Sequence, residues 1–212
     1  NMPPMGTINL HGSLLPQYRG AAPINWAIIN GEKETGVTTF KLKHEIDTGD
    51  ILLQERFPIG EDETAGELHD KMNAVGAALL VETARQLAEG KLEEIPQSSF
   101  GKEIRHAPKI FTETCRIDWG KTTDEIHNLI RGLSPFPGAF TGLDGKMLKV
   151  YRSKKEVINP QQVPGKAVSD GKTFLKFSCC DGYVHLTELQ MEGRKRMNVE
   201  DFLRGYHFKV HS

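Results

Sequence analysis

The hydrophobic pattern of the chain changes about half-way along, and this change limits the folds that it can adopt. Up to residue 108, short apolar runs alternate with helical periodicity, which is typical of an α/β domain. Beyond residue 109, short β runs are separated by Asp-Gly pairs at 144, 170 and 181, at the spacing of β-hairpins. We therefore predict an α/β domain over 1–108 and a small antiparallel open β-barrel, of OB-like type, over 109–212.

The clearest single element is a long amphipathic helix over 64–89. Thr64 and Glu67 form a capping box, in which each side chain satisfies a free backbone donor at the start of the helix, and Gly90 suits its end. The residues expected on its buried face are Leu68, Met72, Val75, Leu79, Leu80, Thr83 and Leu87. A polar stretch over 91–108 follows, and we interpret it as a connection between the two domains.

The remaining elements are short. We expect helices over 21–30, 122–131 and 198–206, and strands over 6–10, 36–43, 51–57, 146–153, 173–178 and 183–189. Only three of these strands precede the second domain, which is few for a free-standing doubly wound sheet. We therefore expect an incomplete, Rossmann-like sheet from which an amino-terminal βαβ portion is missing.

Composition narrows the class of protein. No run approaches 18 consecutive apolar residues, and the first residues lack a secretory signal, so we expect a cytoplasmic protein. Three cysteines, two of them adjacent, give neither a disulfide framework nor a metal-binding spacing. Residues 1–110 carry 11 basic and 16 acidic side chains, whereas residues 111–212 carry 16 and 12. The basic half could meet a polyanion, although ordinary variation between two solvated surfaces explains the same difference.

The densest group of reactive side chains lies at the end of the first expected strand. Asn9 and His11 are two positions apart, so their side chains point the same way in extended backbone. An amide donor beside an imidazole can stabilise a developing oxyanion while the imidazole moves a proton. By itself this short pattern is more typical of a strand-to-helix turn whose polar side chains are simply hydrogen-bonded, because an isolated Asn-x-His is a weak motif.

A second group of candidate side chains lies in the expected turn over 45–50. A carboxylate beside His11 would fix the tautomer of the imidazole and stabilise its charged form, and both Asp47 and Asp50 are candidates. A turn in which an aspartate caps backbone amides is the common alternative. His44, Glu45 and Asp47 lack the spacing of a metal site, and Ser13 lacks the strained elbow of a nucleophile, so we predict neither.

The ordered blocks of sequence resemble a known family. The runs 9–16, 18–24, 36–38 and 46–50, with 117–119, 126–131, 135–139 and 193–197 in the second half, are similar to the folate-dependent formyltransferases, and within them to the methionyl-tRNA formyltransferase family. The resemblance covers essentially the whole chain. It implies an incomplete formyltransferase-type sheet in the first domain and a tRNA-binding barrel in the second.

The resemblance also implies a reaction and its residues. The family's catalytic residues fall on Asn9, His11 and Asp47, and its folate-contacting loop falls on Ser13, Leu14, Leu15 and Pro16. The donor would be 10-formyltetrahydrofolate, the acceptor the α-amino group of methionyl initiator tRNA, and no metal would take part. Basic side chains for tRNA phosphates would come from Lys149, Arg152, Lys154, Lys155 and the triplet 194–196. We expect a monomer, and weak or no activity from this stretch of chain alone.

Three other interpretations stay open, and a fourth is disfavoured. Formyltransferases that act on a nucleotide-linked amino sugar share both domains, as does the hydrolase domain of formyltetrahydrofolate dehydrogenase. Glycinamide ribonucleotide formyltransferase shares only the first domain, so residues 111–212 count against it. A non-catalytic RNA-binding module is a minor alternative, because the aromatic pairs typical of RNA-binding sheets are not evident.

Overall fold

The computed structural model describes residues 6–101, 103–160 and 162–207. These residues form two compact units. The first holds the described residues up to Ile110 except 28–31, and the second holds 28–31 and the residues from Phe111 onward. Within the described residues no helix is both long and apolar enough to cross a bilayer.

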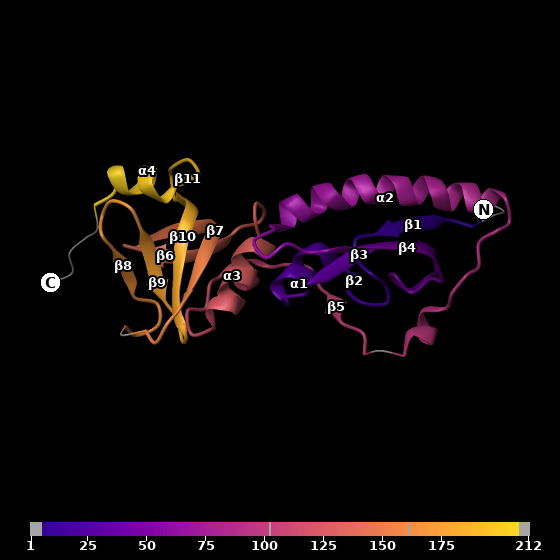
Figure 1. The fold of residues 1–212 in the computed structure, drawn as a ribbon, viewed down its shortest axis with the longest axis horizontal. Helices are drawn as coiled ribbons and strands as arrows, with labels where there is room; N and C mark the ends of the chain where they lie inside the picture. Colours follow the sequence, from indigo (N-terminus) through magenta and orange to yellow (C-terminus); the bar gives the residue numbers. More distant parts are fainter. Residues whose placement is uncertain (1–5, 102, 161, 208–212) are drawn as a thin grey trace. The chain divides into compact units, whose positions relative to one another are not determined.

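The first unit is built on a three-stranded sheet covered by one long helix (Figure 1). Strands β1 (Ile8–His11), β3 (Glu34–Lys41) and β4 (Ile51–Pro58) lie in the order β1-β3-β4, and both pairings are antiparallel. The central strand β3 is buried from Thr35 to Phe40, as expected for a strand with partners on both sides. Helix α2 (Ala65–Ala88) runs along the sheet and packs on β3 and β4.

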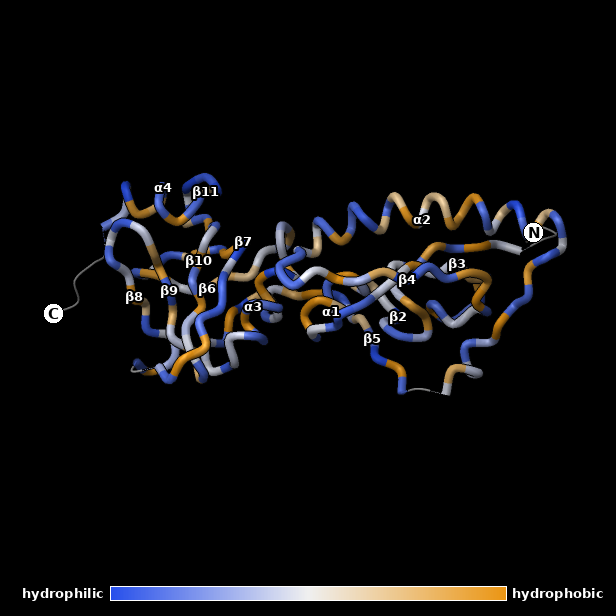
Figure 2. Tube along the Cα trace, viewed as in Figure 1, coloured by the Kyte–Doolittle hydropathy of each residue, from blue (hydrophilic) through white to orange (hydrophobic). Residues whose placement is uncertain are grey.

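Helix α2 confirms the expected capping box but only part of the expected stripe. The side chain of Thr64 accepts a hydrogen bond from the backbone of Glu67, and the Glu67 carboxylate accepts one from the backbone of Thr64. Figure 2 shows hydrophobic and hydrophilic residues alternating along this helix. Leu80 was expected on the buried face and is 37% exposed. Gly76, which was not among the expected residues, is buried instead. It packs against β1 so closely that an added Cβ would lie 2.7 Å from Leu10.

The polar stretch after α2 has more structure than a simple connection. It first forms an antiparallel bridge between Ile95 and Ile51, then a turn of 3₁₀ helix, η1 (Gln97–Phe100), and a short strand, β5 (His106–Ala107). Strand β5 pairs in parallel with β2 (Arg19–Gly20), and helix α1 (Pro23–Ile29) follows β2. This stretch therefore crosses back over the first unit and fixes the loop that follows β1.

The second unit is an antiparallel sheet with short helices packed on its long strands (Figure 1). Its strands lie in the order β6-β7-β10-β9-β8, and β11 pairs with β10. The bounds are β6 (Ala139–Leu143), β7 (Lys146–Val157), β8 (Ala167–Ser169), β9 (Leu175–Ser178), β10 (Gly182–Met191) and β11 (Met197–Asn198). The helical segments are η2 (Thr112–Cys115), α3 (Thr123–Gly132) and α4 (Val199–Arg204).

The sequence pattern located the long strands of this unit and missed the short ones. Strand β7 runs four residues beyond the expected end at 153, because its end stays paired with β10 up to Val157. Strands β6 and β8 were not expected, because their few apolar residues give no clear alternation. The second capping box is confirmed: Thr122 and Glu125 bond reciprocally at the start of α3.

Candidate functional site

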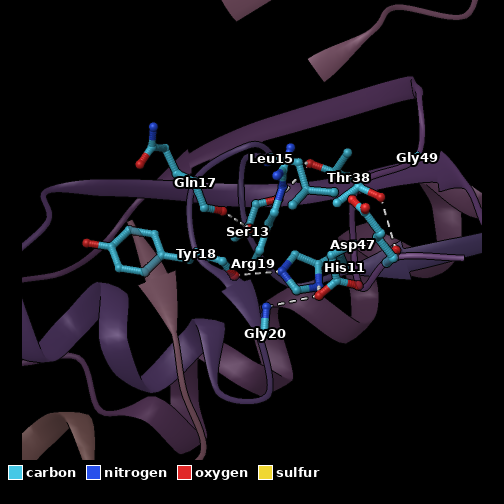
Figure 3. Close-up of polar contacts among 12 residues, drawn as sticks. His11, Ser13, Leu15, Gln17, Tyr18, Arg19, Gly20, Thr38, Asp47 and Gly49 are labelled. Carbon is cyan, nitrogen blue, oxygen red and sulfur yellow. Dashed lines mark hydrogen bonds and ion pairs between the residues drawn. The ribbon is translucent and has the colours of Figure 1, made fainter. Parts of the chain in front are cut away.

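His11 is the last residue of β1, and its ring is held from both sides (Figure 3). Its Nε2 lies 2.8 Å from the backbone carbonyl oxygen of Tyr18, and its Nδ1 lies 3.6 Å from Oδ2 of Asp47. A carbonyl oxygen can only accept a hydrogen bond, so Nε2 carries a proton and donates it. Nδ1 is therefore the nitrogen that can gain and lose a proton, and it faces a carboxylate within reach of an ion pair.

Two features of the backbone position the Asp47 carboxylate: a hydrogen bond from Gly20 and the conformation of Asp47 itself. Its Oδ2 accepts a hydrogen bond of 2.9 Å from the backbone amide of Gly20, and the Asp47 side chain is 12% exposed. The backbone of Asp47 has φ +54°, in the left-handed region that few residues other than glycine adopt, although aspartate, asparagine and histidine do so more often than most. The turn that carries Asp47 is thus specified by contacts around it and not by local preference alone.

Asp50, the other expected candidate, does not take part. Its carboxylate forms an ion pair of 2.8 Å with Lys43, at the other end of the same turn. Between the two expected carboxylates, the structure therefore assigns the position beside His11 to Asp47. Within the described residues no group of histidine, cysteine and acidic side chains could hold a metal ion.

One residue that the sequence analysis missed supports the site from behind the Asp47 turn. Gln97, in η1, is 5% exposed, and its Nε2 donates to the carbonyl oxygens of Asp47 and Gly49, each at 2.8 Å. Its Oε1 accepts from Nε and Nη2 of Arg19 at 2.9 and 2.6 Å. A lone glutamine in a polar stretch gives no sequence signal. Only the return of residues 95–101 and 103–107 over the unit brings Gln97 to the Asp47 turn.

Asn9 lies two residues before His11 in the same strand, as expected. Its side chain is exposed and makes no hydrogen bond to any residue that the structure describes. In register it stands opposite Phe40 of β3, and alternation along the strand gives it the same face as His11. No described residue therefore competes for the two donors of the Asn9 amide.

The loop after His11 is packed tightly. Ser13 and Leu15 are 0% and 1% exposed, and Pro16 is also buried. The Ser13 hydroxyl donates to the carbonyl of Gln17 at 2.7 Å, which leaves it poorly placed to act as a nucleophile with His11. Leu14, Leu15 and Pro16 line a hollow of about 210 Å³, which is smaller than the sites that enclose drug-sized ligands.

The second unit carries the basic residues expected to meet phosphates, and most of them already have partners. Arg152 and Arg196 pair with Glu188, and Lys155 pairs with Asp124. Lys149 and Arg194 donate to the carbonyl oxygens of Pro137 and Gly205. Of the residues expected to contact phosphates, two have ammonium groups without a partner among the described residues: Lys154 and Lys195, whose side chains are both exposed.

Comparison with known protein families matches both parts of the chain. The family model of formyl transferases matches residues 1–84, and that of the formyl transferase C-terminal domain matches residues 109–207. The chain belongs to the formyl transferase family. The His11–Asp47 pair lies within the first match, and the antiparallel sheet of the second unit lies within the second.

The family's curated members include proteins similar to nearly all of this chain. It is 52% identical to the methionyl-tRNA formyltransferase of Azobacteroides pseudotrichonymphae, over 97% of this chain and 66% of that protein. It is 50% identical to that of Phocaeicola vulgatus, with the same coverage, and 48% identical to that of Bacteroides fragilis, over 98% of this chain. The chain spans 66% of the length of these relatives.

Two solved structures share the fold of this chain. HypX from Aquifex aeolicus, in complex with tetrahydrofolic acid, matches with a TM-score of 0.70 and 22% identity, over 96% of this chain and 36% of that one. WlaRD, a sugar 3N-formyl transferase, matches with a TM-score of 0.67 and 24% identity, over 89% and 66%. At this level of identity the likeness establishes the fold, and the acceptor has to be inferred from other observations.

Proposed function

We propose that the protein containing this chain transfers a formyl group from 10-formyltetrahydrofolate to the α-amino group of methionyl initiator tRNA in the cytoplasm. The observation that carries this proposal is the 45–52% identity to methionyl-tRNA formyltransferases over at least 97% of the chain. Catalysis would rest on Asn9, His11 and Asp47, and no metal is needed for the chemistry.

The reaction is an acyl transfer between two nitrogen atoms. The methionyl amine attacks the formyl carbon, the carbonyl oxygen takes up negative charge, and the folate nitrogen then leaves with a proton. His11 is the group that moves the proton, through Nδ1, because its Nε2 is committed to the Tyr18 carbonyl. General acid–base catalysis of this kind contributes roughly two to four orders of magnitude in rate.

Asn9 and Asp47 assist at different points. The exposed amide of Asn9 donates to the oxygen that becomes negatively charged, and the loss of such a donor costs about 3–4 kcal/mol of transition-state stabilisation. Asp47 stabilises the imidazolium of His11 while it holds the proton, since Oδ2 lies 3.6 Å from Nδ1. The loop of Ser13, Leu14, Leu15 and Pro16 would form one wall of the folate site.

The second unit would bind the tRNA backbone. Lys154 and Lys195 are the residues to which we assign phosphate contacts first, because an ammonium group without a protein partner loses no ion pair on binding. Replacing either with alanine should weaken tRNA binding and reduce the slope of log K against log salt by about 1. Lys155→Ala is the matched control for Lys154, since both lie on β7, and we expect a smaller effect because Lys155 is already paired with Asp124.

The deciding experiment uses the full-length protein and offers formyl donor with three acceptors: methionyl initiator tRNA, a nucleotide-linked amino sugar, and water. We expect formylation of the tRNA only. Formylation of the sugar would instead support an amino-sugar formyltransferase, and hydrolysis of the donor alone would support a formyltetrahydrofolate hydrolase. Asn9→Ala and His11→Ala should each abolish most of the turnover while tRNA binding, measured separately, persists.

A further inference from the structure

Every hydrogen-bonding group of the Gln97 side chain is used. Its amide nitrogen donates to two backbone carbonyls, those of Asp47 and Gly49, and its amide oxygen accepts two bonds from the guanidinium of Arg19. A buried amide with all its donors and acceptors satisfied is held in one orientation, because any rotation breaks several bonds at once. Gln97 is therefore a rigid link between η1, the Asp47 turn and β2.

The segment that carries Gln97 is itself anchored. Two residues before it, Ile95 exchanges backbone hydrogen bonds of 2.8 and 2.9 Å with Ile51 at the start of β4. After it, β5 pairs with β2, so Arg19 and Gly20 are held by the same segment. Gln97 thus reaches the Asp47 turn from a fixed position on the sheet.

The Asp47 turn needs such support. Asp47 has φ +54°, and its neighbour Gly49 packs so closely on β3 that an added Cβ would lie 1.5 Å from the carbonyl oxygen of Lys41. The Gly20 amide that binds the Asp47 carboxylate is equally confined, since an added Cβ there would lie 2.5 Å from the Ala107 carbonyl oxygen. The Gly20 amide that binds the Asp47 carboxylate is fixed by residues 106–107, and the Asp47 backbone carbonyl is bound by Gln97.

We propose that Gln97 is a positioning residue for the formyl transfer: it sets the Asp47 carboxylate beside Nδ1 of His11 by binding the carbonyl oxygens of Asp47 and Gly49. This inference rests on the proposed function. Gln97 touches neither substrate nor the reacting atoms, and it acts through the turn. The contact with Arg19 is the second half of the link, and it aligns the amide so that both of its N–H groups face the turn.

The test compares four variants of the full-length protein. Gln97→Met keeps the size of the side chain and removes all four bonds. Gln97→Glu keeps acceptors for Arg19 and replaces the donors with an oxygen that faces two carbonyl oxygens. Arg19→Met removes only the second half of the link. Ser99→Ala is the control on the same 3₁₀ turn, because the Ser99 hydroxyl is exposed and, among the described residues, binds only the Pro96 carbonyl.

The steady-state constants separate positioning from simple structural support. We expect kcat of Gln97→Met and Gln97→Glu to fall roughly 10- to 100-fold, with KM for the tRNA and the folate nearly unchanged, since a misplaced catalytic group costs this much in rate. Arg19→Met should lose less, and Ser99→Ala should match the wild type. A lower melting temperature with unchanged kcat, or a wild-type rate for Gln97→Glu, would overturn the proposal.

Crystal structures of the same variants give a readout that does not depend on activity. In Gln97→Met or Gln97→Glu the turn should shift, and the distance from Asp47 Oδ2 to His11 Nδ1 should exceed the 3.6 Å of the wild type. An unmoved turn overturns the proposal even if the protein proves to use another acceptor. If Gln97→Met does not fold, Gln97→Glu decides the matter alone. A wild-type protein without formylating activity would instead contradict the proposed function.

Discussion

The Asp47 carboxylate and the His11 imidazole lie 3.6 Å apart, Oδ2 to Nδ1, in a part of the molecule where both side chains are nearly buried. The same Oδ2 binds the Gly20 amide at 2.9 Å. A carboxylate that accepts a hydrogen bond from fixed backbone cannot easily turn away, so it presents its charge to the imidazole in one geometry.

Asp47→Asn tests the charge of this pair without changing its shape. The amide oxygen can still accept from Gly20, so folding should persist, but the imidazolium of His11 loses its counter-charge. We expect the formylation rate of the full-length protein to fall roughly 100-fold or more. Single-turnover formylation with saturating tRNA measures the chemical step directly. A rate within a few-fold of the wild type would exclude a catalytic part for the Asp47 charge.

Gly49→Ala tests how tightly the turn packs on β3. The new methyl group would lie 1.5 Å from the Lys41 carbonyl oxygen, so the turn or the strand has to move. We expect a loss of about 1–3 kcal/mol in the free energy of unfolding. Denaturant unfolding measures it, and Gly142→Ala is the control, because an added Cβ there meets nothing within 4 Å. Equal stability of the two variants would contradict the packing described here.

Thr64→Ala tests the capping box of α2. The Thr64 hydroxyl accepts from the Glu67 amide and donates to its carboxylate, so its loss removes two hydrogen bonds at the start of the helix. The free energy of unfolding should fall by about 1 kcal/mol. Thr64→Ser keeps the hydroxyl and should retain most of the stability. A serine variant as unstable as the alanine variant would assign the effect to the methyl group instead.

Glu156 should make the second unit sensitive to acid. Hydrogen bonds from Lys176 and then His185 lower the pKa of its carboxyl below the ordinary value of 4.5. Because the folded-state pKa is lower than that of the unfolded chain, the stabilisation is complete above the unfolded pKa and is lost as the pH falls through the folded pKa. Glu156→Gln should therefore reduce the melting temperature at pH 7 and much less at pH 3.

The control for this titration is Glu113→Gln, in the same unit. Glu113 is exposed, and its side chain has no hydrogen bond to a described residue, so its replacement should change the melting temperature little at either pH. A gap between wild type and Glu156→Gln that is as large at pH 3 as at pH 7 would show that the charge of Glu156 is not the source of the stabilisation.

The three cysteines should differ in reactivity. Burial raises the pKa of Cys115, and raises that of Cys179 to about 11, so at pH 8 both remain neutral thiols, whereas Cys180 is exposed. Since the thiolate is the nucleophile, alkylation at pH 8 should modify Cys180 quickly and the other two only after unfolding. Mass spectrometry of the native protein measures this. A fast-reacting thiol in Cys180→Ser would contradict the burial of Cys179.

The sequence predicted what local patterns encode. The capping boxes at Thr64 and Thr122 follow from side-chain identity three residues apart, and both are confirmed. The resemblance to the family predicted Asn9, His11 and Asp47 as catalytic residues, and their roles stay a prediction. The choice between Asp47 and Asp50 was not local: it depends on which carboxylate meets the Gly20 amide, and that contact joins residues 27 positions apart. The contacts of Gln97 could not be predicted for the same reason, because its hydrogen-bond partners lie up to 78 residues away in the sequence.

The Nε2 partner of His11 is a main-chain oxygen, that of Tyr18. A backbone atom is present whatever amino acid stands at its position, so exchanging the phenol ring leaves this hydrogen bond in place as long as the loop keeps its path. Side chains around the site can therefore change, and the acceptor preference can change with them. The proton stays on Nε2 of His11 as long as the backbone keeps the Tyr18 carbonyl in place.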